Sequence, residues 1–316
     1  MIIITGQTAT GKTKLALEYA KKYNGELINC DSRQIYKYLD IITGKDLSPR
    51  VSSRAERSGV EGSVWLYDFI KPYKYFSSFD YVKAVQNIIK DVKKRRKTPI
   101  LVGGSYFYLK HLLYGFDTKV PPNFRLREKL NNKTVEKLHN ILKKLNVKSF
   151  NQMNNSDRNN PRRLIRKIEI EKAAKKTGVE GKGVPDGLPA GRQARSREVL
   201  FEASTDGNEP ETGPVFLMIG LRYKNKEKLR EAIKTRVEKR LKQGAIKEVE
   251  LLLKKGYQKT DPGLKTIGYQ QIIDYLEGNT TKKQAIEKWI TAEVQYAKRQ
   301  YTFMKKDKNI KWRLIS

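Results

Sequence analysis

Eight residues near the start of the chain, positions 6–13, have the types and spacing of a phosphate-binding loop. They read G-Q-T-A-T-G-K-T, and this segment (the phosphate loop below) follows an apolar run and precedes an amphipathic one. Its two glycines permit backbone angles that other residues resist, so the loop can turn its N–H groups toward phosphate oxygens. Lys12 is placed to meet the outer phosphate, and the Thr13 hydroxyl can bind Mg2+. The pattern predicts a polyphosphate site and does not specify ATP.

Asp31 is a second candidate for chemistry, because it directly follows residues 26–30, an apolar run that we predict as the second strand. Ligands of open α/β sheets bind at the carboxyl ends of the strands, so this carboxylate is expected to face the phosphate loop. A structural role is the alternative, in which Asp31 or Ser32 caps a helical turn that begins near Gln34. The two roles are compatible.

The elements that must position these residues follow an α/β pattern. Strands are predicted at residues 1–4, 26–30, 99–104 and 215–221, and helices at 14–20, from Ser77 or Ser78 to about 97, and at 105–113. The strand at 99–104 ends in Gly103 and Gly104, where a P-loop ATPase would carry an acidic Mg2+ ligand. We expect these two glycines to let a bulky ligand approach the backbone closely. The predicted fold is α/β, a P-loop NTPase-like parallel sheet core with a small all-helical insertion domain.

Composition shifts along the chain divide it into four parts. Residues 1–118 are predicted as the first part of the P-loop core, and residues 119–176, which are helical and basic, as the insertion domain. Residues 177–214 are rich in Gly, Pro, Ser and charged residues and are predicted as a flexible linker. Residues 215–316 are predicted to complete the core with one strand and otherwise helices. Residues 44–63 are expected to form an exposed loop.

The charge balance points to a polyanionic partner. The 316 residues include 66 Lys and Arg against 34 Asp and Glu, a net charge of +32, which together with the phosphate loop favours a nucleic acid. Cys30 is the one cysteine, so a disulfide framework or a cysteine metal cluster is excluded, and it is expected to pack as a small apolar side chain. The phosphate loop leaves no room for a signal peptide, and no apolar run is long enough to span a bilayer. We expect a cytoplasmic protein.

Residues 296–303 interleave basic and aromatic side chains, reading Y-A-K-R-Q-Y-T-F. Such a set can hold phosphates and stack on unpaired bases. The alternative is an amphipathic helix whose aromatic residues pack into the core. The sequence leaves both open.

Several segments, in this order, resemble the tRNA dimethylallyltransferases, also called tRNA isopentenyltransferases. They are GQTATGKT at 6–13, DSRQIY at 31–36, PILVGGSYFYLKHLLYG at 99–115, NPRRLIR at 160–166, RVEKRLKQGAIKEV at 236–249, TIGYQQ at 266–271 and QYAKRQYTF at 295–303. The resemblance covers nearly the whole chain. It implies transfer of a dimethylallyl group from dimethylallyl diphosphate to N6 of the adenosine 3′-adjacent to the anticodon of tRNA, with Mg2+ as cofactor.

The resemblance also assigns residues. It implies that Asp31 is the general base and that Lys12, Thr13 and Arg236 act on the leaving diphosphate, with Thr13 toward the metal. It implies that the diphosphate is bound by Gly6, Gln7, Thr8, Ala9, Thr10, Gly11, Lys12 and Thr13. It implies that tRNA is contacted by Asp31, Ser32, Arg33, Gln34, Ser105, Arg125, Arg162, Arg163, Leu164, Ile165, Arg166, Lys265, Thr266, Ile267, Gly268, Tyr269, Gln270, Lys298, Arg299, Gln300, Tyr301, Thr302, Phe303, Met304 and Lys305.

The chain departs from the family pattern in four places. The first is the phosphate loop, in which Gln7 stands where proline is usual and Thr10 where serine is usual. The second is residues 41–46, which replace the usual G-T-A-K-P, and the third is the absence of a histidine pair before Leu66. The fourth is the linker at 177–214, which has no counterpart in the pattern. The competing hypothesis is a P-loop kinase acting on RNA ends or nucleotides, against which the glycine pair at 103–104 counts. We expect a monomer that binds tRNA and dimethylallyl diphosphate and no membrane.

Overall fold

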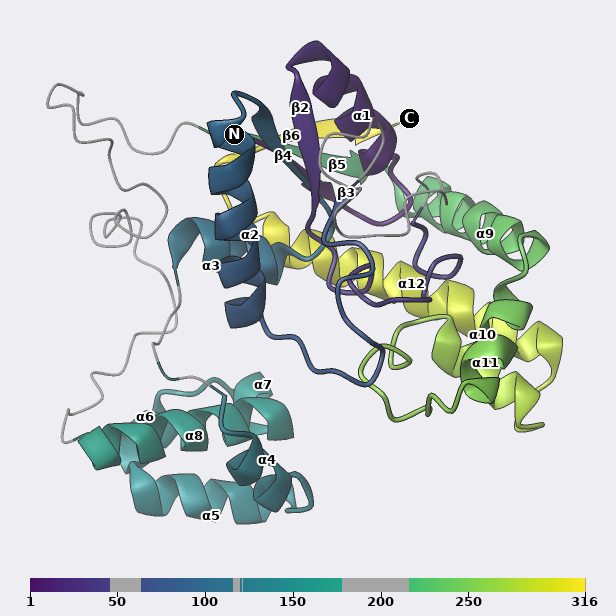
Figure 1. Ribbon diagram of the computed structural model, residues 1–316. Coiled ribbons are helices and arrows are strands. Elements are labelled where there is room, and N and C mark those ends of the chain that lie inside the picture. Colours follow the sequence, from purple (N-terminus) through teal and green to yellow (C-terminus); the bar gives the residue numbers. More distant parts are fainter. Residues whose placement is uncertain (46–63, 116–119, 121, 178–215, 316) are drawn as a thin grey trace, which may run out of the picture. The chain divides into compact units, whose positions relative to one another are not determined.

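The computed structural model describes residues 1–45, 64–115, 120, 122–177 and 216–315 (Figure 1). It divides into two compact units, Met1–Leu113 with Ala203–Ser316, and Tyr114–Glu202, and each is described by itself. Apart from their first residues, the predicted linker at 177–214 and the predicted exposed loop at 44–63 lie outside the described residues.

The first unit is built on a six-stranded sheet whose neighbouring strands all pair in parallel, in the order β3-β2-β4-β1-β5-β6. The strands are β1 Ile2–Gly6, β2 Gly25–Asn29, β3 Val64–Trp65, β4 Thr98–Val102, β5 Leu217–Tyr223 and β6 Ile310–Ile315. This confirms the predicted α/β parallel sheet. Because β1 lies between β4 and β5, the phosphate loop begins in the middle of the sheet.

The prediction that the chain is helical after its last predicted strand was wrong at its end. Residues Ile310–Ile315 form β6, which pairs with β5 at the edge of the sheet. Ile310 is the one fully buried residue of β6, and Leu314 is 55% exposed. An edge strand that buries so little carries neither the apolar run nor the clean alternation that identifies a strand in a sequence.

Helix α1, Lys12–Lys22, packs on one face of the sheet. Its Ala16 is fully buried in a cluster with Ile2, Ile4 and other alternate strand residues, while Ile3 between them points to the opposite face. Helix α2, Ser78–Lys94, packs against β4 and begins at the predicted cap, since the Ser77 side chain and Asp80 form a capping box. Helix α3, Tyr106–Tyr114, follows β4 as predicted.

The remaining described helices of this unit form a helical lobe beside the sheet (Figure 1). They are α9 Lys226–Lys242, α10 Ala245–Lys254, α11 Tyr269–Leu276 and α12 Lys282–Met304. Their shared core is the cluster around Trp289, which is fully buried, and it includes Ile35, Leu39 and Ile42 of the segment after β2. Helix α12 also contacts β1, so this long helix links the lobe to the strand that carries the phosphate loop.

The second unit has a hydrophobic core of its own. Its helices are α4 Phe124–Asn131, α5 Val135–Leu145, α6 Val147–Asn151, α7 Asn155–Arg158 and α8 Pro161–Thr177. Leu138, Leu142, Leu164 and Ile168 are completely buried between them. The unit is all-helical in its described part and contains the region 119–176 that was predicted as an insertion, although it begins at Tyr114.

Candidate active site

The phosphate loop has the backbone conformation that its glycines allow. Ala9 and Gly11 are left-handed, with φ of 64° and 74°, and Gly6 has φ of 128°. A Cβ atom at Gly6 would lie 2.1 Å from the Leu221 carbonyl oxygen, so only glycine fits beside β5. Lys12 and Thr13 begin α1, whose N-terminus contributes a partial positive charge to the loop.

Helix α12 and strand β5 fix the position of the phosphate loop through two glutamines. Gln300 Oε1 accepts a hydrogen bond from the Thr8 N–H at 2.9 Å, and Gln300 Nε2 donates to the Gly104 carbonyl at 3.0 Å. Gln7 donates its backbone N–H to Leu221 at 3.0 Å, a bond that proline could not make, and its side-chain oxygen accepts from the Tyr223 N–H at 3.1 Å. The Gln300 side chain, which we expected at the RNA, is therefore used inside the protein.

Lys12 lies where three charges meet. Its Nζ donates to the Gln7 carbonyl at 2.5 Å. Desolvation and the nearby Arg236 guanidinium lower the pKa of Lys12 to about 8, and the Asp31 carboxylate opposes part of that shift. The structure thus brings together three of the residues singled out in the sequence from regions more than 200 positions apart.

Among the described residues, Arg236 on α9 has hydrogen-bond partners along one edge. Its Nη2 pairs with Glu293 of α12, and the other oxygen of Glu293 accepts from Arg240 Nη1 at 3.2 Å and from Trp289 Nε1 at 2.8 Å. Burial would raise the pKa of Glu293, but the charges of Arg236 and Arg240 hold it below its usual value. Arg236 Nε is buried and has no hydrogen-bond partner among the described residues. One N–H of this guanidinium therefore remains available to an acceptor.

A cavity of about 960 Å³ joins these groups. Its lining includes the phosphate loop from Thr8 to Thr13, the strand-end residues Asp31 and Gly103, and Arg236. Further cations line it from α9, namely Lys228, Lys239 and Arg240. The arrangement suits a small ligand with a polyanionic head.

Asp31 combines the two roles that the sequence left open. Its Oδ1 accepts from the Arg33 N–H at 2.9 Å and its backbone carbonyl accepts from the Gln34 N–H at 3.3 Å, which stabilises a turn rather than a helix. Asn29 fixes the Asp31 backbone, donating to its carbonyl at 3.0 Å and accepting from its N–H at 2.9 Å. The carboxylate nevertheless lines the cavity that contains Lys12.

Protein groups approach Gly103 and Gly104 closely. A Cβ atom at Gly103 would lie 2.1 Å from the carbonyl carbon of Cys30, and one at Gly104 would lie 2.2 Å from Gln300 Nε2. Gly103 also lines the cavity, so close approach of a ligand at this strand end stays a prediction. Cys30 itself is fully buried, as predicted, and burial raises the pKa of its thiol to about 12.

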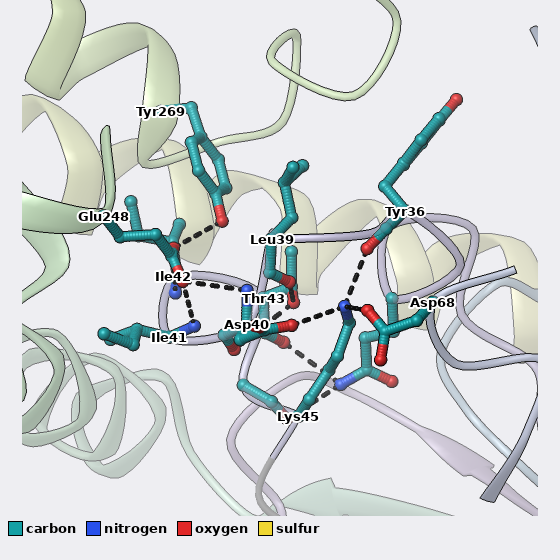
Figure 2. A network of polar contacts seen from close by, with 12 residues as sticks. Tyr36, Leu39, Asp40, Ile41, Ile42, Thr43, Lys45, Asp68, Glu248 and Tyr269 are labelled. Carbon is teal, nitrogen blue, oxygen red and sulfur yellow. Dashed lines mark hydrogen bonds and ion pairs between the residues drawn. The ribbon is translucent and has the colours of Figure 1, made fainter. Parts of the chain in front are cut away.

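Residues 39–45, which include the described part of the segment 41–46 that departs from the family pattern, are held by a carboxylate that the sequence did not identify (Figure 2). Glu248 of α10 accepts hydrogen bonds from the backbone N–H groups of Asp40, Ile41 and Ile42 at 2.9, 2.6 and 3.2 Å, and from the Tyr269 hydroxyl at 2.6 Å. A single glutamate on an amphipathic helix resembles an ordinary solvated residue, so no local signal marked it.

The same segment is tied to the cavity wall. Lys45 Nζ donates to the Tyr36 carbonyl at 2.7 Å and pairs with Asp40 and Asp68, both at 2.6 Å (Figure 2). Gln34 Nε2 donates to the carbonyls of Thr43 and Gly44 at 3.1 and 2.8 Å. Gln34, Thr43 and Gly44 all line the cavity, so Glu248 and Lys45 shape it from outside.

The residues expected to contact tRNA differ in exposure. In the first unit Lys265, Lys298, Arg299, Thr302, Phe303 and Lys305 are exposed, and in the second unit Arg125, Arg162 and Arg163 are exposed. Thr266, Gly268, Tyr269, Gln300 and Met304 are buried in the first unit, and Leu164 and Ile165 belong to the core of the second. A direct tRNA contact stays a prediction for these residues, and burial limits what their side chains can offer to a macromolecule.

Four further residues predicted at the tRNA make hydrogen bonds within the protein: Ser32, Arg33 and Ser105 in the first unit and Arg166 in the second. Ser105 Oγ accepts from the Ser32 N–H at 2.9 Å, and Arg33 Nη1 donates to the Pro262 carbonyl at 3.3 Å. In the second unit Arg166 pairs with the buried Glu169 and donates to the Val120 carbonyl at 2.6 Å.

No helix in the described part of the chain combines the length and the apolar character needed to cross a membrane.

Comparison with known proteins shows which family this chain resembles. Residues 34–307 match the family model described as IPP transferase. The tRNA dimethylallyltransferase of Acetivibrio thermocellus is 34% identical over 317 residues, covering 99% of this chain and 90% of that protein, and that of Thermoanaerobacter sp. (strain X514) is 32% identical over 319 residues with the same coverage.

Two solved structures are similar to this chain over nearly its whole length. The full-length tRNA isopentenylpyrophosphate transferase from Bacillus halodurans is 28% identical, with a TM-score of 0.63, and the match covers 99% of this chain and 89% of that one. A eukaryotic dimethylallyltransferase acting on tRNA, at 23% identity and a TM-score of 0.69 over 99% of this chain and 73% of that one, shares the fold. The chain therefore belongs to the IPP transferase family, together with the tRNA dimethylallyltransferases.

Proposed function

We propose that this protein transfers the dimethylallyl group of dimethylallyl diphosphate to N6 of the adenosine 3′-adjacent to the anticodon of tRNA. The observation that carries the proposal is the meeting of Lys12, Arg236 and Asp31 with the phosphate loop in one cavity. Two cations and a row of loop N–H groups suit a leaving diphosphate, and a carboxylate beside them suits an amine that must lose a proton. Family membership supports the same reaction.

The leaving group determines the cationic half of the site. When the allylic C–O bond breaks, the electron pair leaves with the diphosphate, so negative charge grows on its oxygens. Lys12, the phosphate loop and Arg236 are fixed before the reaction begins, by Gln300, Gln7 and Glu293. Fixed donors of this kind stabilise developing charge without a reorganisation cost.

The amine determines the role of Asp31. N6 of the flipped adenosine attacks the allylic carbon, a C–N bond forms, and the amine proton moves to the Asp31 carboxylate. A positioned general base of this kind contributes roughly 10²–10⁴-fold to a rate. Because Asp31 Oδ1 already accepts from Arg33, the carboxylate is oriented before the adenosine enters.

Mg2+ fits this site only with the help of the substrate. No group of three or more His, Cys, Asp or Glu side chains that could hold a metal occurs among the described residues. Mg2+ is commonly held by phosphate oxygens and water with few protein ligands. We propose that Thr13 Oγ is the protein ligand and that the metal adds positive charge to that of Lys12 on the diphosphate.

The nucleic acid must deliver its base to this cavity. A base that takes part in chemistry is flipped out of its stack, and a single-stranded loop makes that extrusion less costly than a duplex does. The net charge of +32 and the exposed basic residues of both units suit the phosphates of a folded RNA. We place the reaction in the cytoplasm.

One experiment separates this reaction from the kinase hypothesis. The full chain is incubated with unmodified tRNA and either dimethylallyl diphosphate or ATP, and the digested nucleosides are analysed by mass. Prenylated adenosine with the first donor and no phosphorylated product with the second is the expected result. Phosphoryl transfer from ATP to RNA without prenylation would overturn the proposal. Lys12→Ala serves as the control for a reaction that depends on the phosphate loop.

A further inference from the structure

Three tyrosines from separate loops form an exposed cluster in the first unit, named here the tyrosine patch. It consists of Tyr38, Tyr73 and Tyr257 with Lys255. The Tyr38 and Tyr73 rings lie 6.2 and 6.5 Å from the Tyr257 ring, measured between centroids. Tyr38 is 42% exposed and Tyr73 is 47% exposed, so large parts of two aromatic rings remain in contact with solvent. Neither the sequence motifs nor the proposed chemistry accounts for this cluster.

The patch carries positive charge as well as aromatic surface. Lys255 Nζ lies 4.3 Å from the centre of the Tyr38 ring, and Lys74 Nζ lies 5.3 Å from that of Tyr73. A hollow of about 480 Å³ beside them is lined by Tyr73, Lys255, Gly256, Tyr257, Gln258 and Asp261. Lysine is depleted at protein–protein interfaces, whereas aromatic rings interleaved with lysines are typical of surfaces that bind single-stranded nucleic acid.

Tyr38 occupies a strained backbone conformation. Its φ of 69° lies in the left-handed region, which is unusual for a bulky residue. Such conformations persist where the surrounding structure enforces them, and they concentrate at functional sites. The chain is fixed directly after Tyr38, because Glu248 accepts hydrogen bonds from the N–H groups of residues 40–42.

Hydrogen bonds connect the patch to the proposed reaction site. Asp261, which lines the hollow, precedes Pro262, whose carbonyl accepts from Arg33, two residues after Asp31. The Gly263 N–H donates to the Pro72 carbonyl at 2.9 Å, and Pro72 precedes Tyr73. The loops that carry the patch are therefore bonded to the segment that carries the proposed general base.

We propose that the tyrosine patch stacks unpaired bases of the same RNA loop that delivers the target adenosine to Asp31. This inference rests on the proposed function and extends it by a binding site for flanking nucleotides. Stacking recognises the faces of bases and tolerates changes in their identity, so the patch contributes affinity and placement rather than a sequence code. Lys255 and Lys74 supply charge to the phosphates between those bases.

The test is equilibrium binding of a labelled anticodon stem-loop RNA to the full-length protein, with Tyr73→Ala as the variant. Removal of one stacking ring weakens binding on the order of 5- to 100-fold. The slope of log affinity against log salt stays unchanged, because the substitution removes no charge. Lys255→Ala, in contrast, lowers that slope. At saturating RNA the Tyr73→Ala protein retains its turnover, so the RNA KM rises while kcat does not change.

The chain offers a matched control. Tyr23 at the end of α1 is 41% exposed, its ring lies 5.5 Å from that of Tyr19, and Lys22 Nζ lies 5.3 Å from its centre. Tyr23 lies at the C-terminal end of α1, whereas the phosphate loop lies at the N-terminal end of this helix. Tyr23→Ala removes the same exposed aromatic surface and leaves RNA affinity unchanged.

The outcomes separate this inference from the proposed function. If the parent prenylates tRNA and Tyr73→Ala binds the stem-loop as tightly as the parent, or if Tyr23→Ala weakens binding equally, the patch is not a stacking site. If Tyr73→Ala weakens RNA binding selectively but the parent prenylates nothing, the patch stands and the proposed reaction fails. A stem-loop with abasic loop positions adds a double-mutant cycle, in which Tyr73→Ala has no further effect on binding.

Discussion

The lowered pKa of Lys12 predicts that diphosphate binding weakens as the pH rises through about 8. With a pKa of about 8, Lys12 is about nine-tenths protonated at pH 7 and about one-tenth protonated at pH 9. A diphosphate binds the protonated form, so its affinity falls roughly tenfold, or about 1.4 kcal/mol, between these two values.

Calorimetric titration with inorganic diphosphate from pH 6.5 to 9.5, at constant ionic strength, measures this dependence. Lys12→Met is the control. It binds more weakly and reports the part of the pH dependence that comes from ionisation of the diphosphate itself. The affinity of the parent relative to that of Lys12→Met is expected to fall roughly tenfold between pH 7 and 9. A ratio of the two affinities that stays constant over this range would refute the reasoning.

The same pKa shift has a consequence for stability with a defined sign. The folded pKa of Lys12 lies below its ordinary value of 10.5, so the unfolded chain binds more protons between about pH 8 and 10.5. The free energy of unfolding therefore gains a contribution that rises with pH through this window. Below about pH 8 the charged, partly buried Lys12 destabilises the fold, and we expect Lys12→Met to melt at a higher temperature at pH 7. A melting temperature below that of the parent would contradict this account.

Three further predictions concern other parts of the site. Asp31→Asn keeps the hydrogen bond from Arg33 but cannot take a proton. Single-turnover prenyl transfer should therefore slow by roughly 10²–10⁴-fold while donor affinity stays unchanged. A rate within a few-fold of the parent would show that Asp31 is not a catalytic residue. The double variant Arg125→Ala with Arg162→Ala should lower the slope of log affinity for tRNA against log salt by about 0.7 for each phosphate that the protein no longer neutralises. An unchanged slope would show that these arginines of the second unit do not bind the RNA backbone. Glu248→Gln weakens three hydrogen bonds from backbone N–H groups, so the free energy of unfolding should fall by about 1–3 kcal/mol. We also expect the KM for the donor to rise. A loss of stability with an unchanged donor KM would show that Glu248 supports the fold and not the cavity.

Sequence reasoning located the central strands because they are continuous apolar runs with clear boundaries. Residues 1–4, 26–30 and 99–104 correspond to β1, β2 and β4, whose side chains are buried on both faces of the sheet. The helix cap at Ser77 could also be predicted from the sequence, because its hydrogen bonds join residues only three positions apart. β6 was missed because an edge strand that exposes most of its residues carries no such signal.

The site was less accessible to sequence reasoning wherever a role depends on partners distant in the chain. The phosphate loop and Asp31 follow from local patterns, while Arg236 was assigned through the family resemblance alone. Gln300 illustrates the limit, because its motif suggested RNA contact and the structure uses its side chain to join the phosphate loop to Gly104. Glu293 lies outside every quoted motif, and Glu248 lies within the segment 236–249 without being singled out. Each of the two glutamates binds residues from a separate part of the chain.

Two features of the cavity call for the same ligand charge. Lys12 and Arg236 disfavour each other's charge, which contributes to the low pKa of Lys12, and Glu293 is already shared between Arg236 and Arg240. Arg236 Nε, in addition, is buried without an acceptor among the described residues. A diphosphate would relieve both, because its oxygens accept from Nε and place negative charge between the two cations. Since that charge increases as the allylic bond breaks, the interactions that bind the donor become stronger in the transition state, which is the condition for them to accelerate the reaction.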